Sequence, residues 1–230
     1  MQPYLWPYLG YFQLLALSDV FIVYDDVNFI KKGWINRNRV LGAQGPLLFS
    51  VPLQSVSQNK TIKDTALHQT YDKWRVKFLT TLRHCYGGTP HFGKVFPLIE
   101  QVMESCYPGD SISKLCLQSL QCIKQYLNLT TQLRLSSVSF TNQDLKAQNR
   151  ILDICKQEQA TRYVNLIGGR ELYIPKDFEQ HSIELLFHKI KEHQYKQFDV
   201  WQPYLSIIDV LMFCDQEETR KLLQQYELIR

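Results

Sequence analysis

The sequence lacks the short patterns by which the commonest cofactor and catalytic sites are recognised. None of its six cysteines stands in a C-x-x-C pair, which excludes a zinc ribbon and a thioredoxin-like motif. It contains no G-x-G-x-x-G, P-loop, H-E-x-x-H or G-x-S-x-G pattern, so sites built on those motifs are excluded as well. No stretch approaches about eighteen uninterrupted apolar residues, so no transmembrane helix is expected.

The chain also has only a small excess of charge of one sign. The formal net charge is +4, which is too small for the dense basic face of a nucleic-acid-binding protein. A mildly basic chain suits a small anionic substrate instead, such as a nucleotide-sugar or an activated acyl donor. The start has no charged segment ahead of an apolar run, as a signal peptide would have. We therefore expect a cytoplasmic protein whose cysteines are reduced and act as small hydrophobic residues.

The sequence does contain the material of one α/β domain over residues 1–230. Hydrophobic residues make up 45% of the chain and charged residues 21%, which is enough apolar surface for a core at this length. The apolar, β-rich run 20–24 predicts a buried strand and 47–53 a second one. The polar segment 28–45 between them is expected to be a loop.

From residue 71 the apolar period lengthens to about four residues, which is typical of a helix. Trp74, Phe78 and Leu82 fall on one helix face. We expect residues 71–128 to be helical throughout, as a subdomain or an insertion in an α/β part made of 1–70 and 129–230.

Strands and helices alternate again after the helical segment. The sequence predicts strands over 133–140, 162–166 and 183–187, and helices over 141–159, from Pro175, over 206–213 and over 217–226. This order favours an α/β fold with a mostly parallel sheet and helices on both faces. Ligands of such sheets bind beyond the carboxyl ends of the strands.

Asp25 and Asp26 close the first predicted strand. Because successive side chains of a strand point to opposite faces, one carboxylate can face the crevice while the other caps or pairs. A general base needs such a placement, so both are candidate catalytic residues. The alternative is a solvated strand end. Two adjacent aspartates alone do not make a metal site, and no metal is assigned.

The segment 31–39 combines cations, amides and an indole ring. Guanidinium and ammonium groups bind phosphate or carboxylate, and an indole can stack on a sugar or a base. We therefore expect a substrate-binding clamp, against the alternative of an exposed basic loop. Its members are Lys31, Lys32, Trp34, Asn36, Arg37, Asn38 and Arg39.

A third candidate is the aromatic, proline-rich start of the chain. Residues 3–11 loosely resemble the proline–histidine–glycine–histidine turn of nucleotidylyl transferases, in which the amino end of a helix receives phosphate. Tyrosines stand where the histidines would be, so imidazole catalysis is excluded and only the shape is shared. The alternative is an aromatic turn packed into the core. The candidate substrate-binding residues are Gln2, Tyr4, Tyr8, Gly10 and Tyr11.

A glycine turn follows the predicted strand 162–166. Its backbone amides could hold an oxyanion, and the alternative is an ordinary turn. The candidate residues are Tyr163, Asn165, Gly168 and Gly169. We expect this turn, the acidic pair and the clamp to open onto one shared cavity.

Two further patterns receive no catalytic role. Ser206 and Asp209 stand as Ser-x-x-Asp directly before an apolar helical run, which is typical of a helix cap. The histidines, His188 and His193 among them, show no i, i+4 spacing for a metal. The cofactor is left open.

Five motifs run in order along the chain: QPYLWPYLGYFQ at 2–13, DDV at 25–27, the segment 31–39 with WINRN, YVNLIGG at 163–169 and LSIIDVLMF at 205–213. Together they resemble the WbqC-like family, which is found among bacterial surface-polysaccharide and O-antigen gene clusters. The resemblance covers essentially all 230 residues.

The resemblance implies a role in lipopolysaccharide or other surface-polysaccharide biosynthesis. We expect a transferase acting on a sugar precursor, for example by acyl or aminoacyl transfer to an amino sugar. A non-catalytic accessory or ligand-binding protein of the pathway and a relative of nucleotidylyl transferases are the alternatives. Such families carry a short apolar strand before the Gln-Pro motif. We therefore expect a strand ahead of Met1, and its loss would cost roughly 1.5–3 kcal/mol per large side chain left unburied.

Overall fold

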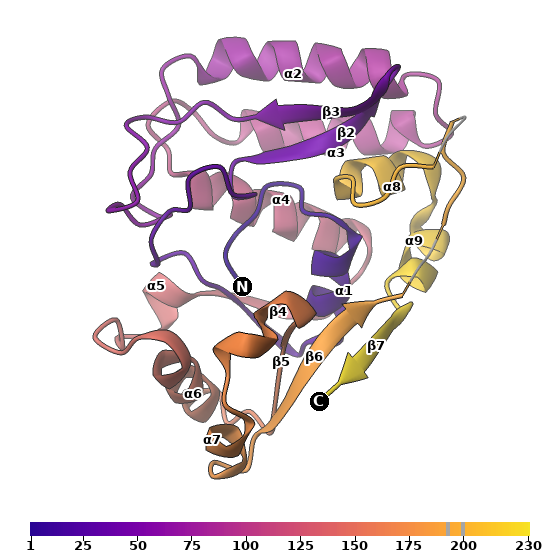
Figure 1. The fold of residues 1–230 in the computed structure, drawn as a ribbon. Coiled ribbons are helices and arrows are strands. Elements are labelled where there is room, and N and C mark those ends of the chain that lie inside the picture. Colours follow the sequence, from indigo (N-terminus) through magenta and orange to yellow (C-terminus); the bar gives the residue numbers. More distant parts are fainter. Residues whose placement is uncertain (192–193, 199–200) are drawn as a thin grey trace.

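The computed structural model describes residues 1–191, 194–198 and 201–230 and shows a mixed α/β fold (Figure 1). His193 lies outside the described residues. The elements are α1 (Leu9–Leu17), β1 (Val20–Val23), β2 (Arg37–Gly42), β3 (Gly45–Ser50), α2 (Tyr71–Tyr86), α3 (Phe92–Glu104), α4 (Ile112–Tyr126), β4 (Gln132–Leu135), α5 (Ser136–Ser139), α6 (Ala147–Gln157), β5 (Arg162–Leu166), η1 (Ile167–Leu172), α7 (Pro175–Glu179), β6 (Glu184–Ile190), α8 (Ile207–Phe213), α9 (Gln216–Leu222) and β7 (Tyr226–Ile229).

The strands form small separate sheets. β1 and β4 pair in parallel, with Phe21 opposite Leu133, and β5 and β6 pair in parallel, with Val164 opposite Leu186. β7 adds antiparallel to β6, and β2 and β3 form an antiparallel hairpin. The α/β class is confirmed, but the expectation of one mostly parallel sheet is wrong for the described residues, which show no dominant parallel sheet.

Three local predictions fail where side-chain contacts override sequence pattern. The expected loop 28–45 contains β2. In this strand Asn38 and Val40 are buried, while Arg37 and Arg39 are partly exposed. The expected strand 133–140 stops at Leu135, and Val138 is 79% exposed. The expected helix 141–159 begins only at Ala147, without a capping box.

Near the carboxyl end the last strands also differ from expectation. β6 runs to Ile190, beyond the predicted 183–187. The helix expected over 217–226 ends at Leu222, and the chain then returns as β7 beside β6. α9 itself is held by a capping box in which Asp215 and Glu218 bond to each other's backbone amides.

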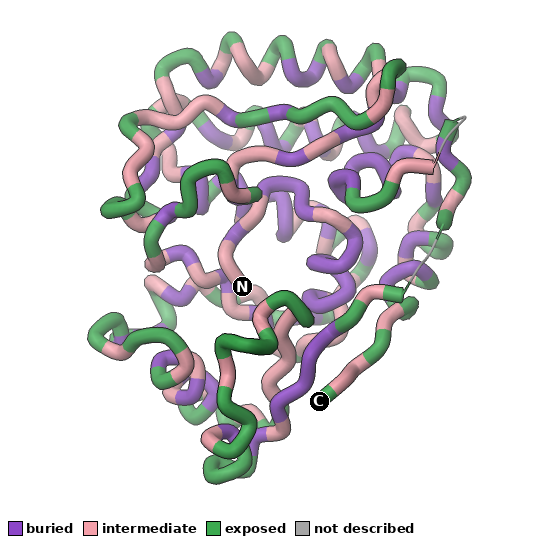
Figure 2. Tube along the Cα trace, viewed as in Figure 1, coloured by how far each residue is buried: buried purple, intermediate pink, exposed green. Residues whose placement is uncertain are grey.

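The helical segment 71–128 is confirmed as three helices. α2, α3 and α4 form the upper layer in Figure 1. Their buried residues belong to the same hydrophobic cluster as those of α1, β1 and α8. A smaller cluster lies between α6, α7 and β6. Figure 2 shows the buried positions gathered toward the middle of the molecule, while the β3 edge and η1 are exposed. No helix among the described residues is long and apolar enough to cross a bilayer.

The amino terminus lies in the middle of the molecule (Figure 1). The Met1 amine donates to Ile22 O at 2.8 Å, and Tyr24 N donates to Met1 O at 2.7 Å, which is the bonding of a parallel bridge beside β1. Burial lowers the pKa of this amine from 8.0 to about 5. A cavity of about 470 Å³ lies next to Met1 and is lined by both β1 and β5.

The cavity lies where two strands each have a partner on the other side only. Backbone groups of alternate residues point to opposite edges of a strand, so those of Val20 and Ile22 face away from β4. By the same alternation, those of Arg162 and Val164 face away from β6. The expected strand ahead of Met1 stays a prediction.

Candidate functional site

The Asp25 carboxylate at the end of β1 is held by serines. Its residue is 2% exposed. Oδ1 accepts from Ser137 N at 3.0 Å and Oδ2 from Ser137 Oγ at 2.8 Å, and Ser113 Oγ on α4 lies at 3.4 Å. Asp25 therefore joins the ends of β1 and β4 and touches α4.

Asp26 forms an ion pair with a residue that sequence reasoning missed. Arg150 Nη2 on α6 donates to Asp26 Oδ2 at 2.6 Å, and the two side chains are 4% and 2% exposed. Ser136 Oγ donates to Asp26 Oδ1 at 2.6 Å. The guanidinium also stacks on the ring of Tyr24 at 4.7 Å, and Asn142 Oδ1 accepts from its Nε.

These contacts set the charge state of Asp26. Burial alone raises the pKa of the carboxyl group, but hydrogen bonds from Arg150, Ser136 and Gln143 outweigh it and lower the pKa below its ordinary value. The same pairing raises the pKa of Arg150 despite its burial. Asp26 is therefore a carboxylate engaged within the protein, and the catalytic roles predicted for Asp25 and Asp26 stay predictions.

The clamp residues divide into structural and exposed groups. Asn38 Nδ2 donates to Trp6 O at 2.7 Å, and Asn36 Nδ2 donates to Val51 O at 2.8 Å, so both amides hold backbone. Arg37 donates to the carbonyls of Gly33 and Lys32 and closes their loop. Lys31 and Lys32 are exposed at the surface.

Trp34 and Arg39 form the part of the clamp that lies at the surface. The guanidinium carbons of Arg37 and Arg39 lie 5.5 and 5.6 Å from the Trp34 ring, which is 42% exposed. Arg39 Nη2 approaches Tyr204 O at 3.5 Å, and its buried Nε has no hydrogen-bond partner among the described residues.

Backbone groups of the aromatic turn 3–11 form hydrogen bonds with two segments that are distant in sequence. Leu5 N donates to Ile35 O, Ile207 N donates to Pro7 O, and Ser206 Oγ donates to Trp6 O. The motifs at 2–13, 31–39 and 205–213 therefore meet. Tyr11 is fully buried and donates to Gln2 O at 2.9 Å, and its ring lies 5.7 Å from that of Tyr4.

Tyr8 lies at the surface end of this turn. Its ring covers the first turn of α1, because a Cβ on Gly10 would come within 2.6 Å of Tyr8 Cε2. Burial, and then Tyr4 and Tyr204 nearby, raise the pKa of Tyr8 to about 12, so its hydroxyl stays protonated. The ring also meets Tyr204 edge-on at 6.3 Å.

A second cavity, of about 340 Å³, opens beside Tyr8. It is bounded by the start of α1, the end of β6 and residues 201–205. Its aromatic lining consists of Tyr8, Tyr195, Trp201 and Tyr204. Because Tyr204 also contacts Arg39, the cationic surface of the clamp borders this aromatic pocket.

The glycine turn adopts a 3-10 helix instead of an open anion-binding loop. Tyr163, Asn165 and Tyr173 form a hydrogen-bonded trio, with Asn165 Nδ2 donating to Tyr173 Oη at 2.7 Å. Gly169 packs against Asn165, whereas a Cβ on Gly168 would meet no atom within 4 Å. Gly168 therefore has no steric need to be glycine.

Neither of the two cavities described above brings the acidic pair, the clamp and the glycine turn together. The large cavity beside Met1 includes Tyr163 and Asn165 but neither aspartate of the pair nor any clamp residue. The aromatic pocket includes Tyr8 but none of the acidic or glycine-turn candidates. Asp25 and Asp26 point instead into contacts with α5 and α6, because serine and arginine donors lie there.

Sequence reasoning missed several residues of these sites. The sequence predicts a strand at Ser136 and Ser137 and an ordinary helix at Arg150, and the available signal is an arginine next to apolar helix positions. The Ser206 cap is confirmed, since its Oγ accepts from Ile208 N at 3.3 Å. Asp209 is fully buried. Within the described part of the chain, no three His, Cys, Asp or Glu side chains come together as metal ligands.

Comparison with known proteins identifies one family that matches nearly the whole chain. Residues 2–221 match the WbqC-like protein family. A relative from Mycobacterium tuberculosis (strain ATCC 25618 / H37Rv), named uncharacterized protein Rv1507c, is 30% identical over 209 residues, covering 89% of this chain and 88% of the relative. No solved structure matches. The chain therefore belongs to the WbqC-like protein family.

Proposed function

We propose that this protein acts on an anionic sugar precursor in the assembly of a bacterial surface polysaccharide. The observation that carries the proposal is the contact series Trp34–Arg39–Tyr204–Tyr8. The Arg39 guanidinium lies over the Trp34 ring and next to the backbone carbonyl of Tyr204, and the side chains of Tyr204 and Tyr8 line the pocket. Phosphate or carboxylate suits the guanidinium, and ring systems suit the aromatic walls. Family membership supports the biosynthetic context.

The reaction we propose is transfer of an acyl or aminoacyl group to an amino sugar. The amine nitrogen attacks the acyl carbon, an amide bond forms, and the bond to the donor's leaving group breaks. The proton lost by the amine passes to a base or to the departing group. Arg39 would neutralise the anionic substrate during this step.

A non-catalytic accessory protein is the second candidate, and one observation favours it. Both carboxylates predicted as bases accept hydrogen bonds inside the protein, from Ser136, Ser137 and Arg150. A base that serves an acceptor amine needs hydrogen-bond reach to the substrate. An accessory protein would bind the precursor and form no product.

The test measures binding and product formation separately. Amino-sugar nucleotides and acyl donors are added to the protein, and thermal unfolding is followed alongside product mass. A ligand at 100 times its dissociation constant adds about 2.7 kcal/mol of stability. Arg39→Met should lower binding, whereas Arg162→Met, a surface arginine paired with Glu184, should not. Binding without product would support the accessory protein, and no binding would refute both.

A further inference from the structure

The aromatic pocket beside Tyr8 has an outer wall that is neither helix nor strand. Residues 194–198 and 201–205 supply this wall, and Tyr195, Trp201 and Tyr204 line the cavity from it. The rings of Tyr195 and Trp201 meet edge-on at 4.9 Å. A wall of irregular chain keeps its shape only if side chains anchor it.

One buried carboxylate anchors this wall. Asp209 Oδ2 on α8 accepts from Tyr195 Oη and from Gln197 Nε2, both at 2.6 Å. Asp209 Oδ1 accepts from Tyr86 Oη at 2.8 Å, which ties the carboxylate to α2. Gln197 Oε1 in turn accepts from Gln202 N at 2.7 Å. Residues 194–198 are thus bound to Asp209 directly, and residues 201–205 are linked to it through Gln197.

The network also fixes the direction of the Tyr195 hydrogen bonds. A phenol hydroxyl has one proton, and the 2.6 Å contact commits it to Asp209. Gln197 Nε2 lies 3.1 Å from the same oxygen and donates to it. The oxygen of Tyr195 can therefore only accept from a ligand, so it suits a hydroxyl or amino group and not a phosphate.

We propose that this pocket is the subsite for the sugar ring of the precursor, with Tyr195 as an acceptor for one of its hydroxyl or amino groups and Asp209 as the positioning residue of the wall. The inference rests on the proposed function and deepens it. Aromatic faces pack on the C–H face of a sugar ring, while the anionic part of the precursor lies at Arg39 outside the pocket. Cavity volume, aromatic lining and acceptor chemistry all suit a polyhydroxylated ring.

The experiment compares a nucleotide with and without its sugar. Calorimetry measures binding of uridine diphosphate and of uridine diphosphate N-acetylglucosamine to the whole protein. Tyr195→Phe removes the hydroxyl and should weaken binding of the sugar nucleotide about 2- to 12-fold, the value of one hydrogen bond. Binding of uridine diphosphate alone should not change. Trp201→Ala should show the same selectivity.

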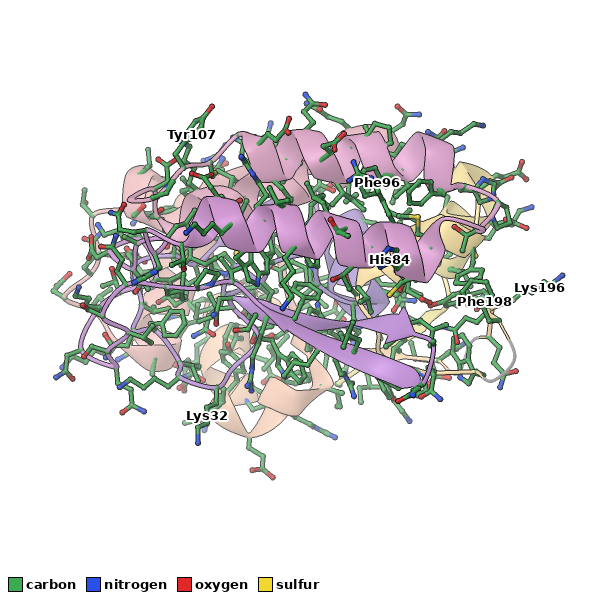
Figure 3. The ribbon with its side chains drawn as sticks, turned by 90° about the horizontal axis from the view of Figure 1, so that it is seen from above. Lys32, His84, Phe96, Tyr107, Lys196 and Phe198 are labelled. Atoms are coloured by element: carbon green, nitrogen blue, oxygen red, sulfur yellow. The ribbon has the colours of Figure 1, made fainter. Side chains whose placement is uncertain are left out.

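Asp209→Asn tests positioning through a readout that general destabilisation would not give. It should weaken binding of uridine diphosphate N-acetylglucosamine more than binding of uridine diphosphate. Both affinities are measured below the unfolding temperature of the variant. If this variant does not fold, Tyr195→Phe carries the test. Tyr107→Phe is the matched control for Tyr195→Phe. Tyr107 is 61% exposed and lies at the opposite side of the molecule from Phe198, which belongs to the wall (Figure 3).

Three results would overturn the subsite. Equal weakening of both ligands by Tyr195→Phe and Trp201→Ala would place the base, not the sugar, in the pocket. Unchanged binding in both variants would place the sugar elsewhere while leaving the proposed function standing. A parent protein that binds neither probe also refutes the subsite for these ligands, and the transfer assay above then decides on the proposed function independently.

Discussion

Arg150 and Asp26 form the most enclosed ion pair among the described residues, with nitrogen and oxygen 2.6 Å apart and side chains 4% and 2% exposed. The pair joins α6 to the end of β1 across 124 residues of sequence. Breaking such a pair leaves a charge buried without its counterion, which costs more than the pair itself contributes.

Arg150→Met should therefore destabilise the protein by about 3–5 kcal/mol, since Asp26 loses its counterion. The control is Arg162→Met, whose partner Glu184 lies at the surface with 36% of its side chain exposed. That change should cost far less, because exposed ion pairs contribute little to stability. Urea unfolding of both variants is the measurement. Equal losses would show that the enclosed pair has no special weight.

Acid should unfold the protein partly through Asp26. Its folded pKa is lowered, so its stabilising contribution is complete above the unfolded pKa of about 3.9 and disappears as the pH falls through the lower folded pKa. Asp26→Asn should be less stable at neutral pH and should lose less stability on acidification. Unfolding free energies between about pH 2 and pH 6 measure this. Parallel curves for parent and variant would contradict it.

The amine of Met1 should make stability rise with pH in a different window. Its pKa falls from 8.0 in the unfolded chain to about 5 in the folded one, so the unfolded chain binds more protons between these values. Stability should rise from about pH 5 to pH 8, by up to about 4 kcal/mol. His188, whose pKa burial also lowers, adds in the same direction.

A peptide joined to Met1 separates the titration of its amine from the stability that an added strand would provide. About five apolar, β-branched residues should remove the amine titration and also stabilise the protein, because they can pair with the free edges of β1 and β5 and fill the cavity. A glycine–serine segment of equal length should remove the titration without that gain. Equal stability of the two extended forms in urea would refute the strand position.

Gly10→Ala should impair binding more than folding. A Cβ at this position comes within 2.6 Å of the Tyr8 ring, which must swing away from the first turn of α1. The clash is with the far end of a partly buried side chain, which can move without unfolding the helix, but its displacement alters the wall of the aromatic pocket. Gly93→Ala is the matched control at the second position of α3, where no atom lies within 4 Å.

The comparison of ligand affinities decides this prediction. Gly10→Ala should weaken binding of the sugar nucleotide several-fold, whereas Gly93→Ala should leave it unchanged, and alanine in a helix should stabilise either variant slightly. If Gly10→Ala binds as the parent does, the position of the Tyr8 ring has no bearing on the pocket.

The local pattern of apolar residues predicted most helices and several strands. α2, for example, follows the helical spacing of Trp74, Phe78 and Leu82. β1 and β5 follow their β-rich runs. β2 could not be predicted, because its buried polar residue, Asn38, donates to the backbone of the distant turn at Leu5 and Trp6.

By itself, the sequence determined the α/β class, the helical segment and the family, since these depend on periodicity and on motifs that are local in the chain. Only the tertiary structure decided which functional groups meet. It directed Asp25 and Asp26 into contacts with Ser137 and Arg150, and it brought Arg39 next to Tyr204, which lines a pocket together with Tyr8. The physical reason is that hydrogen bonds and ion pairs form between side chains close in space, and sequence pattern carries no information on those long-range distances.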